Sequence, residues 1–352
     1  MKTAFVFAAR VLLNRLPAGR IFFLGCTLCF YAEVNAQLPF FTQYQQNPLN
    51  INPALTGYFD DEIKWSGLYR SQAYSRLVTS TFYNTSLQMR PYLNFISDKD
   101  DVGFGINAYS NKTLDVFSHQ AVSASFSFRK GLNYDASQSL TIGFQGRYNT
   151  KRIDYTRLLF PNQFDVIGYT FSLPNNEPIQ VINANYFDLN AGLLFESMND
   201  NESFTAGVSI YNINQISAFK SNLANRYSQS FNYHIGYSRF TSEAAQIFLG
   251  ALHSTVGKQN ATSLVAAYQY MPDYTPFIGF DLGAIYTINH SISPYITVNM
   301  GSLRTSFTYN VPINPNISYL RNANSFEIGF QLLFTRASQE NSLARRHMSC
   351  FK

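Results

Sequence analysis

Apolar and polar residues alternate along much of this chain. In 140–150 (LTIGFQGRYNT) one face reads Leu, Ile, Phe, Gly and Tyr, and the other reads Thr, Gly, Gln, Arg and Asn. The same pattern recurs in 186–197 (YFDLNAGLLFES) and in 324–335 (NSFEIGFQLLFT). Because successive side chains of a β-strand point to opposite faces, this alternation predicts strands with one apolar and one mixed face.

Fourteen stretches are predicted as strands on this basis. They are 61–71, 78–90, 101–111, 118–129, 139–151, 184–196, 203–214, 228–240, 244–253, 261–271, 276–287, 292–300, 303–311 and 324–335. They exceed the roughly 5–6 residues of an average soluble strand and suit the about 9–11 residues that a strand needs to cross a bilayer. An even number of strands is usual in bacterial outer-membrane barrels.

Composition separates a membrane barrel from a soluble β-sandwich, which also alternates. Charged residues make up 13% of the chain, whereas soluble proteins average about 25%. Aromatic residues make up 16%, and no apolar run of about 18 residues follows the N-terminal segment, which excludes α-helical membrane spans. The predicted fold class is therefore all-β, a transmembrane antiparallel β-barrel of the outer membrane with about 14 strands.

The connections between the predicted strands differ in length at the two ends of the barrel. If the chain starts in the periplasm, connections after odd-numbered strands lie outside the cell. The longest of these are 152–183, 215–227 and 312–323, whereas the inner connections include the short 241–243, 272–275 and 301–302. Long outer loops and short periplasmic turns are typical of outer-membrane barrels.

The first 36 residues have the features of a signal peptide. Four basic residues precede or flank the apolar stretch 21–32, and a small residue, Ala36, stands where a signal peptidase would cleave. Cys26 and Cys29 fall in the removed part, so their CxxC spacing predicts no metal or redox site. A later start codon, and lipidation of Cys26, are the alternatives at this end.

The chain is thus divided into four parts. These are a signal peptide (1–36), an extended N-terminal segment (37–57), the barrel (58–335) and a flexible periplasmic tail (336–352) that holds Cys350. Residues 37–335 contain 18 basic and 19 acidic side chains, so the formal net charge of +5 comes from the two ends of the chain. Nucleic-acid binding is not predicted.

No enzyme site is evident in the sequence. The five histidines, His119, His234, His253, His290 and His347, occur singly and without metal-ligand spacing. The Gly-Phe-Gly of 103–105 lacks the third glycine and the helix of a dinucleotide site, and is interpreted as small residues facing a barrel interior. We predict no catalytic residue, metal or cofactor. A hydrolase site assembled from separate strands is the alternative that spacing leaves open.

Charged residues in the strands are expected to face the lumen, because a lipid-facing Arg near the bilayer midplane costs roughly 2–4 kcal/mol. These residues are Arg70, Arg129, Arg147, Asp188, Glu196, Asp281, Arg304 and Glu327. They would either line a pore or pair with one another in a plugged interior. A lumen of about 14 strands needs water, a plug or a partner inside it, and we favour the last two.

Segment 37–57 (QLPFFTQYQQNPLNINPALTG) has no charge, several aromatic residues and two Asn-Pro pairs. Proline excludes helix interiors and strand ladders, and the aromatic side chains favour burial. One hypothesis is that the segment packs at or inside the periplasmic mouth, with Phe41, Tyr44, Pro48 and Pro53 buried and Asn47 and Asn52 capping turns. The other is that it is a simple ordered lead-in to the first strand.

Several of these stretches resemble the PorP/SprF family, outer-membrane proteins of the type IX secretion system and its gliding machinery. The resemblance is most specific in 41–57 (FTQYQQNPLNINPALTG), and it extends to LYRSQ (68–72) and to strand stretches at 186–195, 206–215 and 324–334. It implies family-motif or partner-contact roles for Phe41, Gln43, Tyr44, Asn47, Pro48, Asn52, Pro53, Gly57, Tyr69, Arg70 and Gln72.

The resemblance implies a non-enzymatic protein in the outer membrane that assists export, retention or surface anchoring of a secreted protein. The implied partners are the lipid bilayer, a secreted adhesin or the C-terminal domain of a type IX cargo, and periplasmic or lipoprotein secretion components. The alternative function is a passive diffusion channel for small or apolar solutes, for which the N-terminal motif is unnecessary.

Overall fold

The computed structural model describes residues 41–73, 79–91, 99–158, 163, 181–214, 228–257, 259–271, 278–313 and 325–334. The predicted signal peptide and the C-terminal tail lie outside these residues, so their predictions stay predictions. Among the described residues no helix is both long enough and apolar enough to span a membrane.

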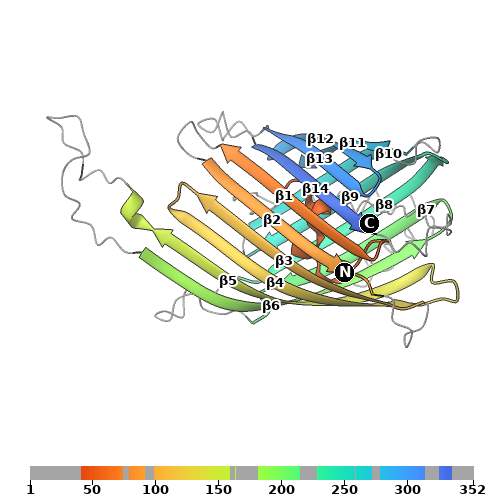
Figure 1. The fold of residues 1–352 in the computed structure, drawn as a ribbon, viewed down its shortest axis with the longest axis horizontal. Helices are drawn as coiled ribbons and strands as arrows, with labels where there is room; N and C mark the ends of the chain where they lie inside the picture. Colours follow the sequence, from red (N-terminus) through yellow and green to blue (C-terminus); the bar gives the residue numbers. More distant parts are fainter. Residues whose placement is uncertain are drawn as a thin grey trace, which may run out of the picture. The chain divides into compact units, whose positions relative to one another are not determined.

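Fourteen antiparallel strands close into one barrel (Figure 1). Each strand pairs with its neighbours in the sequence, and β1 pairs with β14 to close the ring. The strands are β1 Ile63–Ala73, β2 Thr79–Met89, β3 Asp101–Thr113, β4 Phe117–Gly131, β5 Gln138–Asp154, β6 Val181–Met198, β7 Glu202–Tyr211, β8 Ser230–Ser242, β9 Ala245–Val256, β10 Gln259–Tyr270, β11 Ile278–Thr287, β12 Ser291–Met300, β13 Leu303–Pro312 and β14 Ser325–Phe334. All fourteen predicted strands are confirmed, with β5 and β6 longer than predicted.

The two faces of the strands are the reverse of those in a soluble protein. On β5, Ile142 and Phe144 point outward and are 41% and 57% exposed, whereas Thr141 and Gln145 point inward and are buried. Apolar outward side chains are stable in contact with lipid, and inward polar side chains need partners inside the lumen. The alternation in the sequence therefore predicted which face meets the membrane.

We call the end of the barrel where β1 begins and β14 ends the lead-in end, and the opposite end the far end. The longest connections, 155–180, 212–229 and 313–324, join strands at the far end. At the lead-in end the longest connection is 90–100, and others are as short as 243–244 and 301–302. This difference matches the usual asymmetry of outer-membrane barrels and supports a periplasmic lead-in end, which stays a prediction.

Candidate functional site

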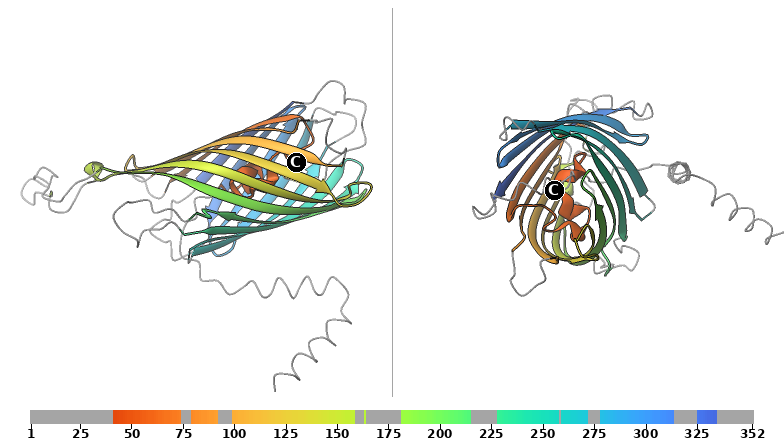
Figure 2. Two further views of the ribbon diagram at one scale, coloured as in Figure 1. Left: turned by 90° about the horizontal axis from the view of Figure 1, so that it is seen from below. Right: turned by 90° about the vertical axis from the view of Figure 1, so that its right-hand side faces the viewer.

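Residues 41–59, called the plug segment below, lie inside the ring of strands (Figure 2). The segment contains three single turns of 3-10 helix, η1 Tyr44–Gln46, η2 Pro48–Asn50 and η3 Pro53–Leu55. In η2 and η3 a proline takes the first position of the turn, where its fixed φ suits the helix and its missing N–H is not needed. The prolines that exclude a strand therefore shape the turns that fill the lumen.

One of the two asparagines predicted to cap turns does so. Asn52 Oδ1 accepts a hydrogen bond from the Ala54 amide at 2.9 Å, at the start of η3. The prediction is wrong for Asn47, which makes no capping bond with its side chain. Its Oδ1 instead accepts from Asn50 Nδ2 and from Asn84 Nδ2 of β2, both at 2.9 Å, because the barrel wall presents a donor there.

Polar side chains on β2–β5, β7 and β8 hydrogen-bond the plug segment and are together called the polar wall. They are Asn84, Gln88, Asn107, Ser125, Ser127, Gln145, Ser209, Tyr211, Asn232 and His234. The carbonyl of Ile51 accepts from Ser209 Oγ at 2.5 Å and from Asn232 Nδ2 at 2.9 Å. Such directional bonds satisfy a backbone that has no strand partner and set its position in the lumen.

Asn52 is held most tightly of the asparagines in the segment, and it is fully buried. Its Nδ2 donates to the Leu193 carbonyl at 2.9 Å and lies 3.1 Å from Nε2 of His234. Two inward glycines that pair directly, Gly143 and Gly192, leave room for the Asn-Pro turn beside it. A Cβ on Gly192 would lie 1.8 Å from Asn52 Oδ1, so this part of the wall accepts no larger residue without displacing the turn.

The opposite side of the plug segment packs against inward apolar side chains of β9–β11, called the apolar wall. These are Phe248, Leu252, Val265, Ala267 and Ile285, and they form one buried cluster with the plug segment. Tyr44, Ile51 and Leu55 are the larger plug-segment members of this cluster. Burying such side chains stabilises the contact by about 25 cal/mol for each Å² removed from water.

The start of the plug segment is clamped by Glu327 of β14. The carboxylate accepts from the amides of Thr42 at 2.6 Å and Gln43 at 2.9 Å. Arg70 Nε lies 3.6 Å from the same carboxylate and Arg70 Nη2 donates to Gln72 Oε1 at 2.9 Å, so the charge is neutralised inside the lumen. Bonds from amides to a carboxylate are stronger than those between neutral groups.

The structure places the remaining predicted site residues as follows. Phe41 is buried against Leu68 and Phe82, whereas Tyr69 lies on the outward face of β1 beside the rings of Tyr83 and Phe326. Gln43, Tyr44, Pro48 and Pro53 are buried in the lumen with Asn47, Asn52 and Gly57. The structure thus brings all the predicted motif residues except Tyr69 into one assembly.

The predicted lumen charges pair with one another or connect through an amide. Arg147 Nη2 lies 2.8 Å from Asp188, and Arg129 lies 3.0 Å from Glu196 and 3.2 Å from Asp101. Asn299 links the other two, because it donates to Asp281 at 3.2 Å and accepts from Arg304 Nε at 2.6 Å. Such pairing suits the plugged interior rather than a charged pore lining.

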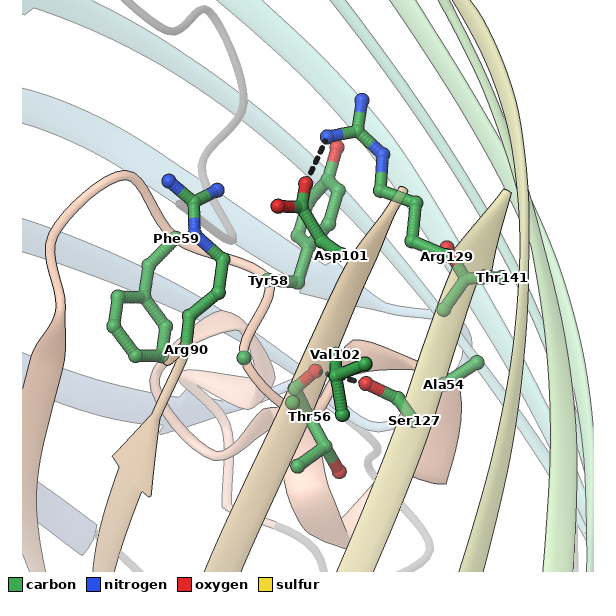
Figure 3. A pocket seen from close by; sticks show the side chains of 12 residues that line it. Ala54, Thr56, Tyr58, Phe59, Arg90, Asp101, Val102, Ser127, Arg129 and Thr141 are labelled. Atoms are coloured by element: carbon green, nitrogen blue, oxygen red, sulfur yellow. Dashed lines mark hydrogen bonds and ion pairs between the residues drawn. The ribbon is translucent and has the colours of Figure 1, made fainter. Parts of the chain in front are cut away.

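A pocket opens beside the place where the plug segment leaves the lumen (Figure 3). It is lined by Ala54, Thr56, Gly57, Tyr58, Phe59, Arg90, Asp101, Val102, Gly103, Ser127, Arg129 and Thr141. Tyr58 donates to Glu196, and Ser127 Oγ donates to the Thr56 carbonyl at 2.6 Å, so the floor of the pocket is anchored to the wall. Among the described residues no group of three His, Cys, Asp or Glu could hold a metal ion.

Sequence reasoning missed both walls of the lumen. Gln145 was predicted on the mixed face of 140–150, but without a partner. Asn84 and Asn232 were not singled out, although they alternate with apolar residues of their strands. The inward position of Phe248 could not be predicted from the sequence, because β9 is apolar on both faces and shows no clear alternation. His234 was interpreted as an isolated histidine. It stands two residues after Asn232, so the alternation within 230–239 places both side chains on the inward face.

A sequence profile of one family matches residues 33–332, and its description is type IX secretion system membrane protein PorP/SprF. A search of curated proteins finds no match. The match covers the plug segment together with nearly all of the barrel.

Similar solved structures are outer-membrane barrels of low sequence identity. A FadL homologue of Pseudomonas aeruginosa is 9% identical, with 80% of this chain and 93% of that chain covered and a TM-score of 0.47. The Pseudomonas putida toluene transporter TodX is 7% identical, with 85% and 98% covered and a TM-score of 0.48. CdiB from Acinetobacter baumannii is 7% identical, with 78% and 60% covered and a TM-score of 0.44.

Proposed function

The chain belongs to the type IX secretion system membrane proteins of the PorP/SprF family, and from this premise we propose that it is a plugged, non-enzymatic barrel that assists export, retention or surface anchoring of a secreted protein. It is a membrane component located in the outer membrane, so the lipid bilayer is its first partner. The specific role in export, retention or anchoring, and the secreted protein that it serves, belong to the proposal.

The observation that carries the proposal is the position of the N-terminal motif. The residues that most specifically resemble the family, 41–57, occupy the lumen and are hydrogen-bonded or packed on both sides. A diffusion channel needs a continuous water-filled path, and a segment packed in the lumen takes up part of that space. A closed barrel is instead suited to presenting its two mouths and its outer surface to other proteins.

The proposed partners follow from these surfaces. The long far-end connections would meet a secreted adhesin or the C-terminal domain of a type IX cargo at the cell surface, and the short lead-in turns would meet periplasmic or lipoprotein components. The motif residues of the plug segment would act indirectly by keeping the barrel closed. Tyr69 faces outward beside Tyr83, so among the motif residues it would be the one to touch a neighbouring membrane protein.

The test is deletion of the gene followed by complementation. We expect the deletion strain to lose a defined protein from the secreted and surface-attached fractions, measured by quantitative mass spectrometry, and the intact gene to restore it. A matched plasmid carrying Tyr69→Ala separates outer-surface contacts from folding, because the lumen is untouched. Unchanged secreted and surface fractions in the deletion strain would contradict the proposal.

A further inference from the structure

Strand β6 has a neighbouring strand on only one side over its far-end part. It has 18 residues, whereas β7 has 10 and pairs only with Ala191–Met198 of β6. On its other side β6 pairs with β5 from Ser197 to Val181. Figure 1 shows β5 and β6 running on beyond the neighbouring strands at the far end.

The pairing between β6 and β7 stops at Asn212 for a conformational reason. Asn212 has a φ of 60°, in the left-handed region, which does not continue an extended strand. The Ile213 amide still donates to the Leu189 carbonyl at 3.0 Å. The Asn214 side chain then takes the place of a peptide group: its Nδ2 donates to the Phe187 carbonyl at 2.9 Å, and its Oδ1 accepts from the Leu189 amide at 3.3 Å. The side of β6 that β7 leaves free therefore binds an amide.

The next backbone groups on this side of β6 belong to residues 181–186, called the open edge below. Every second residue of a strand directs its N–H and C=O to the same neighbour. Val181, Asn183 and Asn185 therefore direct theirs to the side on which Phe187 and Leu189 bind Asn214. Among the described residues no backbone group bonds to them there. The open edge is about 20 Å long, which is enough for a short strand.

The open edge lacks the features that usually prevent a sheet from taking up another strand. Natural edges carry lysine, proline or a bulge, whereas 181–186 reads VINANY and its register with β5 is regular. The adjoining charges of β5 have contacts of their own. Arg152 is paired with Asp154 at 3.0 Å. Lys151 lies over the ring of Tyr186. The open edge therefore suits a strand that carries no charge.

We propose that an extended, uncharged segment of the secreted protein adds to β6 as a further strand at the open edge. This inference rests on the proposed function and deepens it, because it names where the secreted protein is held. Backbone hydrogen bonds to Val181, Asn183 and Asn185 supply the affinity, and the side chains of the segment that lie beside the two asparagines supply the specificity.

A second copy of this chain does not fit the open edge. Two copies in one membrane are related by an axis along the membrane normal. Strands of such barrels are tilted by about 35–45°, so the β6 strands of the two copies would cross at about 70–90° instead of pairing. A segment from outside the membrane has no such restriction on its direction.

The first experiment measures whether the edge is open in the purified barrel. Amide hydrogen exchange, followed residue by residue by NMR, should be at least about tenfold faster at Val181, Asn183 and Asn185 than at Ile182 and Ala184, whose amides face β5. Equal protection of the two sets would mean that the chain covers its own edge and would overturn the inference.

The second experiment blocks the open edge in cells with Asn183→Pro. Proline removes the amide that faces the added strand and leaves the bonds to β5, because Asn183 directs no backbone group to that strand. We expect the surface-attached amount of the secreted protein that gene deletion removes to fall at least about tenfold, measured by quantitative mass spectrometry. Heat-dependent gel mobility reports whether the variant barrel has folded.

The matched control is Asn260→Pro near the far end of β10. The amide of Asn260 faces the side of β11, whose pairing begins only at Ser263, so this proline also falls at an unpaired position. It should leave the surface-attached amount unchanged. If Asn183→Pro folds and leaves that amount unchanged as well, the inference is overturned while the proposed function stands. If gene deletion itself removes no protein, the proposed function fails.

The third experiment identifies the occupant in intact cells. A photoreactive p-benzoylphenylalanine replaces Asn185, and mass spectrometry identifies the crosslinked peptide. We expect a peptide of the same secreted protein, and none when the photoreactive residue replaces Val122 on the lipid face of β4. A peptide of this chain, from a second copy or from the connection between β7 and β8, would overturn the inference.

Discussion

The plug segment meets two different walls, and each makes a different contribution. The polar wall contacts it through single hydrogen bonds with fixed geometry, such as those from Ser209 and Asn232 to the Ile51 carbonyl. The apolar wall contacts it through side chains such as Phe248 and Ile285, which have no directional requirement. A segment without strand pairing needs both, because burial stabilises its presence in the lumen and hydrogen bonds determine its register there.

The difference explains the amphipathic character of an uncharged segment. Ile51 and Leu55 point toward the apolar wall, while the carbonyls and amides of the same turns point toward the polar wall. Variants of the apolar wall should therefore loosen the plug segment without moving it. Variants of the polar wall should move it. Hydrogen exchange of amides 44–58 separates the two results. So does the fraction of disulfide formed between Thr56→Cys and Ser125→Cys, a pair whose native hydroxyl oxygens lie 2.9 Å apart.

The largest effect on stability is expected from Phe248→Ala in the apolar wall. Phe248 is 1% exposed, and removal of a buried Phe side chain costs about 3–5 kcal/mol through lost burial and the cavity that remains. Urea unfolding of the refolded barrel measures this loss. Leu249→Ala, on the lipid face of the same strand, is the control and should cost clearly less. Equal costs would mean that the apolar wall is not a packed core.

The next largest effect is expected from Gly143→Ala in the polar wall. The added Cβ would lie 2.2 Å from Pro53 C and Ala54 N, which are backbone atoms and cannot rotate away. Overpacking costs about 1–3 kcal/mol, so the disulfide fraction should fall and amides 53–57 should exchange faster. Gly146→Ala is the control, since its Cβ meets only the ring tip of Phe187 at 2.8 Å. If Gly143→Ala kept the disulfide fraction and the exchange rates of the unchanged protein, the wall would not fit the Asn-Pro turn closely.

Asn52→Leu should have an intermediate effect of about 2 kcal/mol. The variant keeps the size of the side chain but removes the acceptor of the Ala54 amide and the donor to the Leu193 carbonyl. Exchange of the Ala54 amide, followed by mass spectrometry, measures the change. Asn185→Leu on the exposed outward face of β6 serves for comparison. If both variants exchange alike, Asn52 does not fix the turn.

The smallest effect is expected from Tyr58→Phe, at about 1 kcal/mol. It removes one hydrogen bond to Glu196, whose carboxylate keeps Arg129 at 3.0 Å. Amide hydrogen exchange should become faster near Gly57, while the amides of Thr42 and Gln43 stay protected from exchange. The control Tyr83→Phe removes a hydroxyl from the outward face and should change amide exchange at neither end of the plug segment. Loss of protection at both ends of the plug segment would show that it moves as one rigid unit.

The barrel could be predicted from the sequence because lipid imposes a strict rule on every second residue. In 140–150 and 186–197 the apolar face is nearly uninterrupted, so the strands and their outward faces followed directly. The lengths of β5 and β6 could not be predicted, since the far-end residues beyond the predicted bounds, such as Arg152 and Asn183, are polar on the outward face and interrupt the alternation.

The lumen was less predictable because its pattern depends on what fills it. The prolines and aromatic residues of 41–57 indicated packing, but not which wall each residue would meet. Asn47 shows the limit: its role depends on Asn84, which is distant in sequence. Phe248 and Ile285 are apolar although they face inward, where they pack with the plug segment. No local pattern predicts that this part of the inward face is apolar.

The most direct test of a closed barrel is single-channel recording in planar bilayers. The intact protein should show no stable conductance, and the protein lacking residues 37–57 should show large, steady openings because the polar wall then holds only water. Equal conductance from both proteins would contradict the claim that the N-terminal segment fills and closes the lumen.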